Sequence, residues 1–114
     1  MQRDEAYLLD MLLSAHDAQS VVEQLTREQF QSSRIHQLAS LKALETIGEA
    51  ASRISDTFRS AHPEIPWREI IGMRNRLIHA YFEVDIDKVW ETIQDDLPPL
   101  IDHLQLLIPP PEEP

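Results

Sequence analysis

The sequence contains no cysteine, which excludes a disulfide framework, a thiol nucleophile and thiolate metal ligands. It has only two glycines, Gly48 and Gly72, and the alternation of apolar and polar residues that is typical of strands is hard to find. No stretch approaches the ~20 apolar residues of a membrane span, and the first residues lack the apolar centre of a signal peptide. We therefore expect a cytoplasmic protein that does not engage a membrane.

Basic residues are also scarce. Ten Lys and Arg stand against twenty Asp and Glu, so the formal net charge is −10, and this argues against a nucleic-acid partner, because binding to phosphates depends on Lys and Arg. The acids are unevenly placed, however: residues 82–114 have a net charge of −8, whereas residues 1–81 have a net charge of −2. The acidic end is either a solvated face or a docking surface for a basic partner.

Apolar residues recur at helical spacing through nearly the whole chain. With 114 residues, of which 42% are hydrophobic, the chain has enough apolar material for one core and one domain. We predict a first helix over about residues 3–25, followed by a short turn that Thr26 caps. The apolar stripe then predicts a second long helix over about residues 35–58.

Residues 62–66 should break that helix, because proline cannot continue the hydrogen-bond ladder and also restricts the residue before it. Pro66 suits the first turn of a third helix, whose apolar positions continue to Ile78. The polar interval at residues 83–87 supplies a capping residue for a fourth helix.

Pro98-Pro99 would damage a helix interior, yet the apolar stripe resumes directly after them. We therefore predict a new helix that has these prolines in its first turn and is capped near Asp95 or Asp96. The proline- and glutamate-rich residues 109–114 should be a disordered tail. The fold class expected for residues 1–108 is all-α, a single-domain bundle of four to five helices.

The segment from Arg74 to Tyr81 combines a guanidinium, a carboxamide, an imidazole and a phenol within eight residues. Cleavage of an RNA phosphodiester without a metal needs proton transfer and stabilisation of charge at phosphorus. His79 could transfer the proton near neutral pH, and the fork of Arg74 suits phosphate oxygens. Because one histidine cannot conveniently act as base and acid at once, a symmetric dimer that brings two segments together would supply both.

Helix geometry complicates this arrangement. Arg74 and His79 are five residues apart, which is about 140° around a regular helix, whereas Asn75 and Arg76 are helical neighbours of His79. The first pair can face one phosphate only if the helix loosens near His79 or if the residues converge across a dimer interface. The alternative is an ordinary amphipathic helix end, with arginine near the negative end of the helix dipole and with His79 and Tyr81 half-buried.

The run IIGMRNRLIHAYF at residues 70–82 contains the pattern Arg-x4-His-x-Tyr and resembles the HepT toxins of the HEPN superfamily. The resemblance extends upstream to LETIGEAA at residues 44–51 and PEIPWR at residues 63–68, and downstream through residues 84–98. It covers about residues 40–100 in register. The full run with its flanks is far more specific than the bare Arg-x4-His pattern.

This resemblance implies a helical bundle that dimerises and acts as a metal-independent ribonuclease without a cofactor. Arg74 and His79 match the family's active-site pair near the dimer cleft. Asn75 matches the polar residue after the arginine and is expected to orient the imidazole. Glu49, in the Gly-Glu-Ala segment, and Arg76 are candidates for support of the substrate cleft. The dimers could also assemble into a higher oligomer.

The resemblance further implies a partner. In the family's type VII toxin–antitoxin system the toxin is paired with MntA, a minimal nucleotidyltransferase antitoxin that uses ATP to transfer AMP onto the motif tyrosine, here Tyr81. AMP at this position would add bulk and negative charge where RNA phosphate should bind. Ala80 departs from the polar residue, acidic residue or glycine that is frequent there, and we expect little consequence.

Other patterns in the chain have ordinary explanations. The remaining histidines show no pair at three- or four-residue spacing, so we predict no metal site. Glu45 and Glu49 lie one helical turn apart and, with Lys42, could be a solvated helix face.

Two other functions remain open from the sequence. The chain could be a non-catalytic helical module that binds a nucleotidyltransferase and is its substrate, which the net charge favours. It could also hold a mononucleotide between its arginine and tyrosine. The sequence does not say which RNA would be cleaved.

Overall fold

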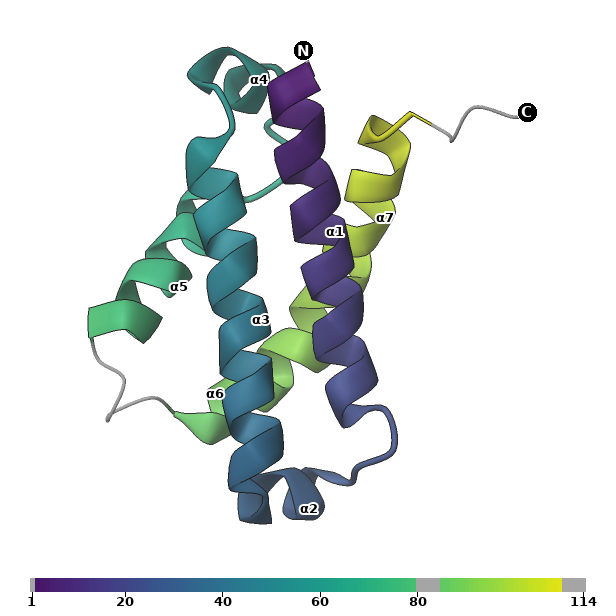
Figure 1. Ribbon diagram of the computed structural model, residues 1–114, viewed down its shortest axis with the longest axis vertical. Helices are drawn as coiled ribbons and strands as arrows, with labels where there is room; N and C mark the ends of the chain where they lie inside the picture. Colours follow the sequence, from purple (N-terminus) through teal and green to yellow (C-terminus); the bar gives the residue numbers. More distant parts are fainter. Residues whose placement is uncertain (1, 80–84, 110–114) are drawn as a thin grey trace.

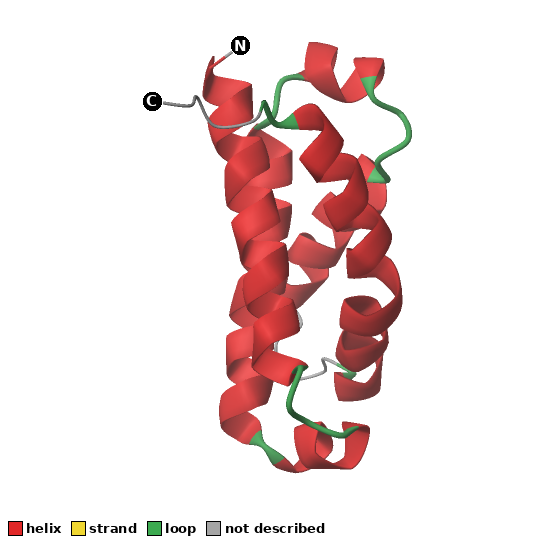
Figure 2. Cartoon of the chain, turned by 90° about the vertical axis from the view of Figure 1, so that its right-hand side faces the viewer, coloured by secondary structure: helices red, strands yellow, loops and turns green. Residues whose placement is uncertain are grey.

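The computed structural model describes residues 2–79 and 85–109, together with the side chains of residues 3–77 and 85–109. In this part of the chain the regular structure is helical throughout, as Figure 2 shows, which confirms the all-α prediction. The predicted tail lies almost entirely outside the described residues. None of the described helices has the length and apolar content that crossing a bilayer requires.

Two long helices, α1 (Gln2–Val22) and α3 (Arg34–Arg53), pack side by side in opposite directions and form the centre of the bundle (Figure 1). Helix α5 (Trp67–His79) packs on α3, and α7 (Leu97–Leu107) packs on α1. Each contributes an apolar stripe to one core, as the helical periodicity predicts. Fully buried members of this core include Leu8, Met11, Leu44, Ile47 and Leu104.

The connection between α1 and α3 contains the short helix α2 (Arg27–Ser32). Thr26 caps it as predicted: its hydroxyl accepts a hydrogen bond from the Gln29 backbone N–H at 3.1 Å, and the Gln29 side chain accepts one from the Thr26 N–H at 2.9 Å. Phe30, which is fully buried, packs against Trp90 with ring centroids 5.4 Å apart. This contact fixes α2 to the helix that follows residue 84.

The predicted second helix is wrong at its C-terminal end, because α3 stops at Arg53 and Ile54 adopts an extended conformation. Ser55 then caps a separate helix, α4 (Asp56–Ala61). The backbone N–H of Ser55 donates to a carboxylate oxygen of Asp4 at 2.9 Å, and its hydroxyl donates to the other oxygen at 2.7 Å. Since this N–H is bound to α1, it cannot continue the ladder of α3.

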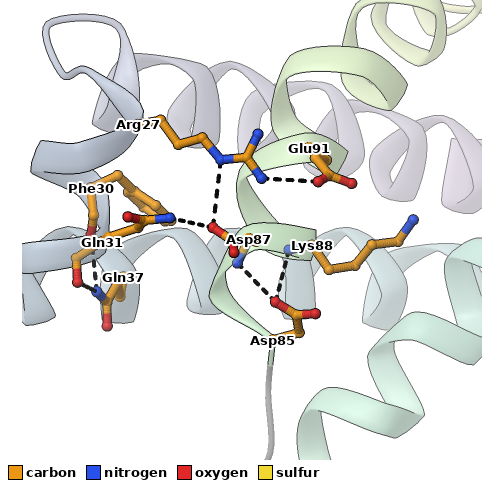
Figure 3. A network of polar contacts seen from close by, with 8 residues as sticks. All are labelled: Arg27, Phe30, Gln31, Gln37, Asp85, Asp87, Lys88 and Glu91. Carbon is orange, nitrogen blue, oxygen red and sulfur yellow. Dashed lines mark hydrogen bonds and ion pairs between the residues drawn. The ribbon is translucent and has the colours of Figure 1, made fainter.

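Helix α6 (Ile86–Glu91) begins as predicted, with the Asp85 side chain accepting hydrogen bonds from the backbone N–H groups of Asp87 and Lys88. Figure 3 shows how its first turns are held on α2. Arg27 pairs with Glu91 at 3.0 Å and with Asp87 at 3.5 Å, and Gln31 donates to Asp87. The chain is therefore anchored immediately after residues 80–84.

A new helix does begin at the prolines, as predicted, but no break in the helical backbone precedes it. The chain passes from α6 through a π-helical turn, η2 (Thr92–Asp96), into α7 while its backbone stays helical. The wider turn accommodates prolines that lack an N–H donor. Pro98 and Pro99 do lie in the first turn of α7, but the Asp96 side chain makes no capping hydrogen bond, in contrast to the prediction.

Candidate functional site

The candidate site is built where α5 crosses α3 at Gly48. A Cβ atom at this position would lie 2.2 Å from the Cβ of Arg74 and 3.1 Å from the backbone oxygen of Ile70. Only glycine therefore allows the two helices to approach so closely. One signal of this role is present in the sequence, since a glycine inside a helix costs about 0.5–1 kcal/mol relative to alanine and needs a structural reason.

This approach places Arg74 beside the next residue of α3. A guanidinium nitrogen of Arg74 forms an ion pair with Oε2 of Glu49. The other oxygen, Oε1, accepts a hydrogen bond from Nε of Arg53 at 2.9 Å and forms an ion pair with Nη2 of Arg53, also at 2.9 Å. We call these three residues the Glu49 cluster. The sequence predicted Glu49 as a supporting residue of the cleft, but it did not identify Arg53.

In the Glu49 cluster, the two guanidinium groups stabilise the ionised form of the Glu49 carboxyl. The pKa of the Glu49 carboxyl is lowered, chiefly by the side-chain hydrogen bond from Arg53; desolvation opposes this in part, and the charges of Arg74 and Arg53 lower the pKa further. The carboxylate is ionised at neutral pH, as any ordinary glutamate is, and its lowered pKa keeps it ionised in more acidic solution. The side chains are 38% exposed for Glu49, 27% for Arg74 and 58% for Arg53, so the cluster is open to solvent.

Arg74 has a second contact, to Asn75, whose Oδ1 accepts a hydrogen bond from Nη1 at 3.3 Å. The Nε of Arg74 is buried and has no hydrogen-bond partner among the described residues. Arg74 is thus held at both ends of its guanidinium, by Glu49 and by Asn75. The predicted contact of Asn75 with the imidazole is not tested, because the side chain of His79 lies outside the described ones.

The backbone of His79 ends α5. In a regular helix it lies about 7.5 Å along the axis from Arg74 and about 140° around it. Ala80 and Tyr81 lie outside the described residues. The meeting of Arg74 and His79 over one phosphate therefore stays a prediction, as does the accessibility of Tyr81.

Arg76 is not part of the Glu49 cluster. It lines a groove of about 490 Å³ between α5, η2 and α7, in which Lys88 and His103 are also found. The groove wall includes apolar side chains such as Ile70 and Met73. Arg76 and Arg74 thus serve different surfaces of α5, although both were predicted near the substrate cleft.

Among the described side chains, those of residues 3–77 and 85–109, no three His, Asp or Glu residues gather as a metal site would require. The cations described at the site are guanidinium groups, which can hold anions such as phosphate or carboxylate through fixed charge and paired N–H donors. The arrangement is suited to stabilising an anion at the exposed edge of α3 and α5.

Comparison with known proteins gives a consistent result. A family model described as ribonuclease HepT-like matches residues 11–107, a range that includes the whole Glu49 cluster and His79. The chain is 44% identical over 95 residues to a protein of Thermococcus cleftensis named a probable ribonuclease HepT, covering 80% of this chain and 86% of the relative.

Two further relatives carry names that describe candidate RNases. One, from Methanocaldococcus jannaschii, is 34% identical over 103 residues, which are 90% of this chain and 94% of the relative. The other, from Caldanaerobacter subterraneus, is 36% identical over 100 residues, covering 88% and 89% of the two chains. No solved structure shows a significant match.

Proposed function

Because the chain belongs to the HepT-like ribonuclease family, we propose that it is a HEPN-type ribonuclease toxin that cleaves RNA with Arg74 and His79 and needs no metal. The proposal is supported chiefly by the way Arg74 is held. Its guanidinium is partly exposed and is held by Glu49 and Asn75. It lies on the same helix as His79, five residues before it.

The proposed reaction is attack of the RNA 2′-hydroxyl on the adjacent phosphorus. His79 takes the hydroxyl proton, and the 5′-oxygen leaves with a proton from a second imidazole. The charge that develops on the phosphoryl oxygens is stabilised by Arg74, whose guanidinium is already fixed before substrate arrives. Preorganisation of this kind avoids reorientation of the cation during the reaction.

We place the second imidazole on the other subunit of a homodimer. A two-fold axis near the end of α5 would bring two copies of His79 to one cleft, where one acts as base and the other as acid. The same axis would bring two copies of Arg74 together, which would raise the positive potential at the cleft of an otherwise acidic chain.

We further propose that the toxin is neutralised by a minimal nucleotidyltransferase antitoxin of the MntA type, in a type VII toxin–antitoxin system. The antitoxin would transfer AMP from ATP onto Tyr81, two residues after His79. The added phosphate would repel RNA electrostatically, and the adenosine would fill the cleft. This chain itself would need no ATP.

The test is cleavage of total RNA by the purified protein in the presence of EDTA. His79→Ala should lower the rate by about 100-fold or more, because general acid–base catalysis contributes about 10²–10⁴. His16→Ala, at an exposed position of α1, is the matched control and should keep full activity. Cleavage that persists in His79→Ala would contradict the proposal.

The net charge of −10 favours a second candidate, a non-catalytic module that binds and is modified by the nucleotidyltransferase. The same preparation distinguishes the two functions. AMP incorporation that requires the partner, without His79-dependent cleavage of RNA, would support the module.

A further inference from the structure

The Glu49 cluster contains an arginine that the proposed reaction does not use. Arg53 stands in the last turn of α3 and directs both Nε and Nη2 to one oxygen of Glu49, at 2.9 Å each. Taken alone, this contact is a surface pair between residues four apart on a helix, which contributes only a few tenths of a kcal/mol. Its setting is different, because the other oxygen of the same carboxylate binds Arg74 from α5.

Two guanidinium groups from different helices therefore share one carboxylate. The three side chains together carry a net charge of +1, on a chain whose total charge is −10. The cluster is thus a local positive site on an acidic protein, and such local charge attracts phosphate more than the total charge suggests.

The chemistry of the carboxylate indicates what the cluster can bind. Carboxylate and phosphodiester groups both present two oxygens that share a negative charge, and both accept the paired N–H donors of arginine. Glu49 holds the two guanidiniums as a phosphate would, and Arg53 keeps 58% of its side chain exposed for a further ligand. Glu49 is ionised at neutral pH, and its lowered pKa extends this arrangement to more acidic solution.

We propose that Arg53 is a second phosphate-binding residue for RNA, which contacts the backbone beside the phosphate bound by Arg74 while Glu49 sets the spacing of the two guanidiniums. This inference rests on the proposed ribonuclease function and adds to it a substrate contact on α3. The contact is to the phosphodiester backbone, so it is independent of base sequence. Arg53 binds substrate and takes no part in proton transfer.

The first test is equilibrium binding of an unstructured oligouridine to the cleavage-impaired His79→Ala protein at several salt concentrations. Adding Arg53→Ala should weaken binding about threefold to tenfold at low salt. It should also reduce the steepness with which the logarithm of the binding constant falls with the logarithm of the salt concentration by about 0.7, the value for one phosphate of a single strand. Arg53→Lys, which keeps the charge but loses the fork, should recover part of the affinity.

Arg34→Ala is the matched control. It removes the same charge from the same helix, at an exposed position about 28 Å away along the axis of α3. Its binding and salt slope should equal those of the parent protein. Equal behaviour of Arg53→Ala and Arg34→Ala would overturn the inference. Thermal unfolding of both variants should match the parent, because each side chain is largely exposed.

Kinetics with His79 intact separate this inference from the proposed function. Arg53→Ala should raise KM and leave kcat nearly unchanged, since the contact is made before and during the reaction alike. Cleavage with wild-type KM in Arg53→Ala would contradict the role of Arg53 alone. Binding of RNA through Arg53 without any cleavage would support this inference and contradict the proposed function, whereas a protein that neither binds nor cleaves RNA would contradict both.

Discussion

Gly48 has no Cβ atom, and this allows α5 to pack close against α3. A methyl group there would overlap the Cβ of Arg74 at 2.2 Å, so the helices would have to separate. We predict that Gly48→Ala lowers the free energy of unfolding by about 1–3 kcal/mol, the usual cost of overpacking. Urea unfolding followed by far-UV circular dichroism measures this change.

Gly72 provides the opposite control. The atom nearest to a Cβ added at Gly72 would be a guanidinium nitrogen of Arg76 at 3.7 Å, which is an ordinary van der Waals contact. Gly72→Ala should therefore stabilise the protein by about 0.5–1 kcal/mol through helix propensity. A Gly48→Ala protein that is equally stabilised would show that the close approach is not needed.

At the scale of elements, a contact between Asp4 in the first turn of α1 and Ser55 at the start of α4 joins two helices that are far apart in the sequence. Asp4 is buried, and it accepts hydrogen bonds from both the N–H and the hydroxyl of Ser55, which lower the pKa of its carboxyl from the ordinary value of an aspartate. We predict that Asp4→Asn costs about 1.5–3 kcal/mol at pH 7, the range for hydrogen bonds to a charged group.

The pH dependence follows from the direction of this pKa shift. A carboxyl group whose pKa is lower in the folded state stabilises the fold above its unfolded pKa, and this contribution is lost as the pH falls through the folded value. The difference in stability between the wild type and Asp4→Asn should therefore shrink below about pH 4. Asp10→Asn, at an exposed position of the same helix, should show a difference close to zero throughout.

The elements that sequence alone predicts are those with local signals. Thr26 and Asp85 begin helices because their own side chains accept hydrogen bonds from backbone groups two or three residues later. The end of α3 has a weaker signal: Ser55 accepts a hydrogen bond from the Phe58 N–H three residues later, but the apolar stripe continues through Ile54 and Phe58 and hides the break. The group that stops the helix, Asp4, is about fifty residues away in the chain.

The candidate site shows the same limit. Arg74, Asn75 and Glu49 were predicted from the motif and its flanks, and the structure brings them together. Arg53 was missed, because a glutamate–arginine pair four residues apart is common on any solvated helix. Its relevance depends on Arg74, which reaches the same carboxylate only through the packing of α5 on α3.

At the scale of the whole molecule, the proposed control by an antitoxin is testable by intact mass. Co-production with a neighbouring nucleotidyltransferase should add one or more AMP units to the protein, because Tyr81 is the proposed acceptor. Tyr81→Phe should abolish the addition. Tyr7→Phe, which changes the other tyrosine of the chain, should retain it. An addition that survives Tyr81→Phe would place the modification elsewhere.

The contact at Gly48 also affects the entropy of the molecule. The first two side-chain carbons of Arg74 lie directly against the glycine, so rotation about its first torsion is confined before any ligand arrives. A free arginine side chain carries about 2 kcal/mol of rotamer entropy. Much of that freedom is lost when the chain folds. Binding of an anion to Arg74 therefore costs less entropy than binding to a freely rotating arginine would.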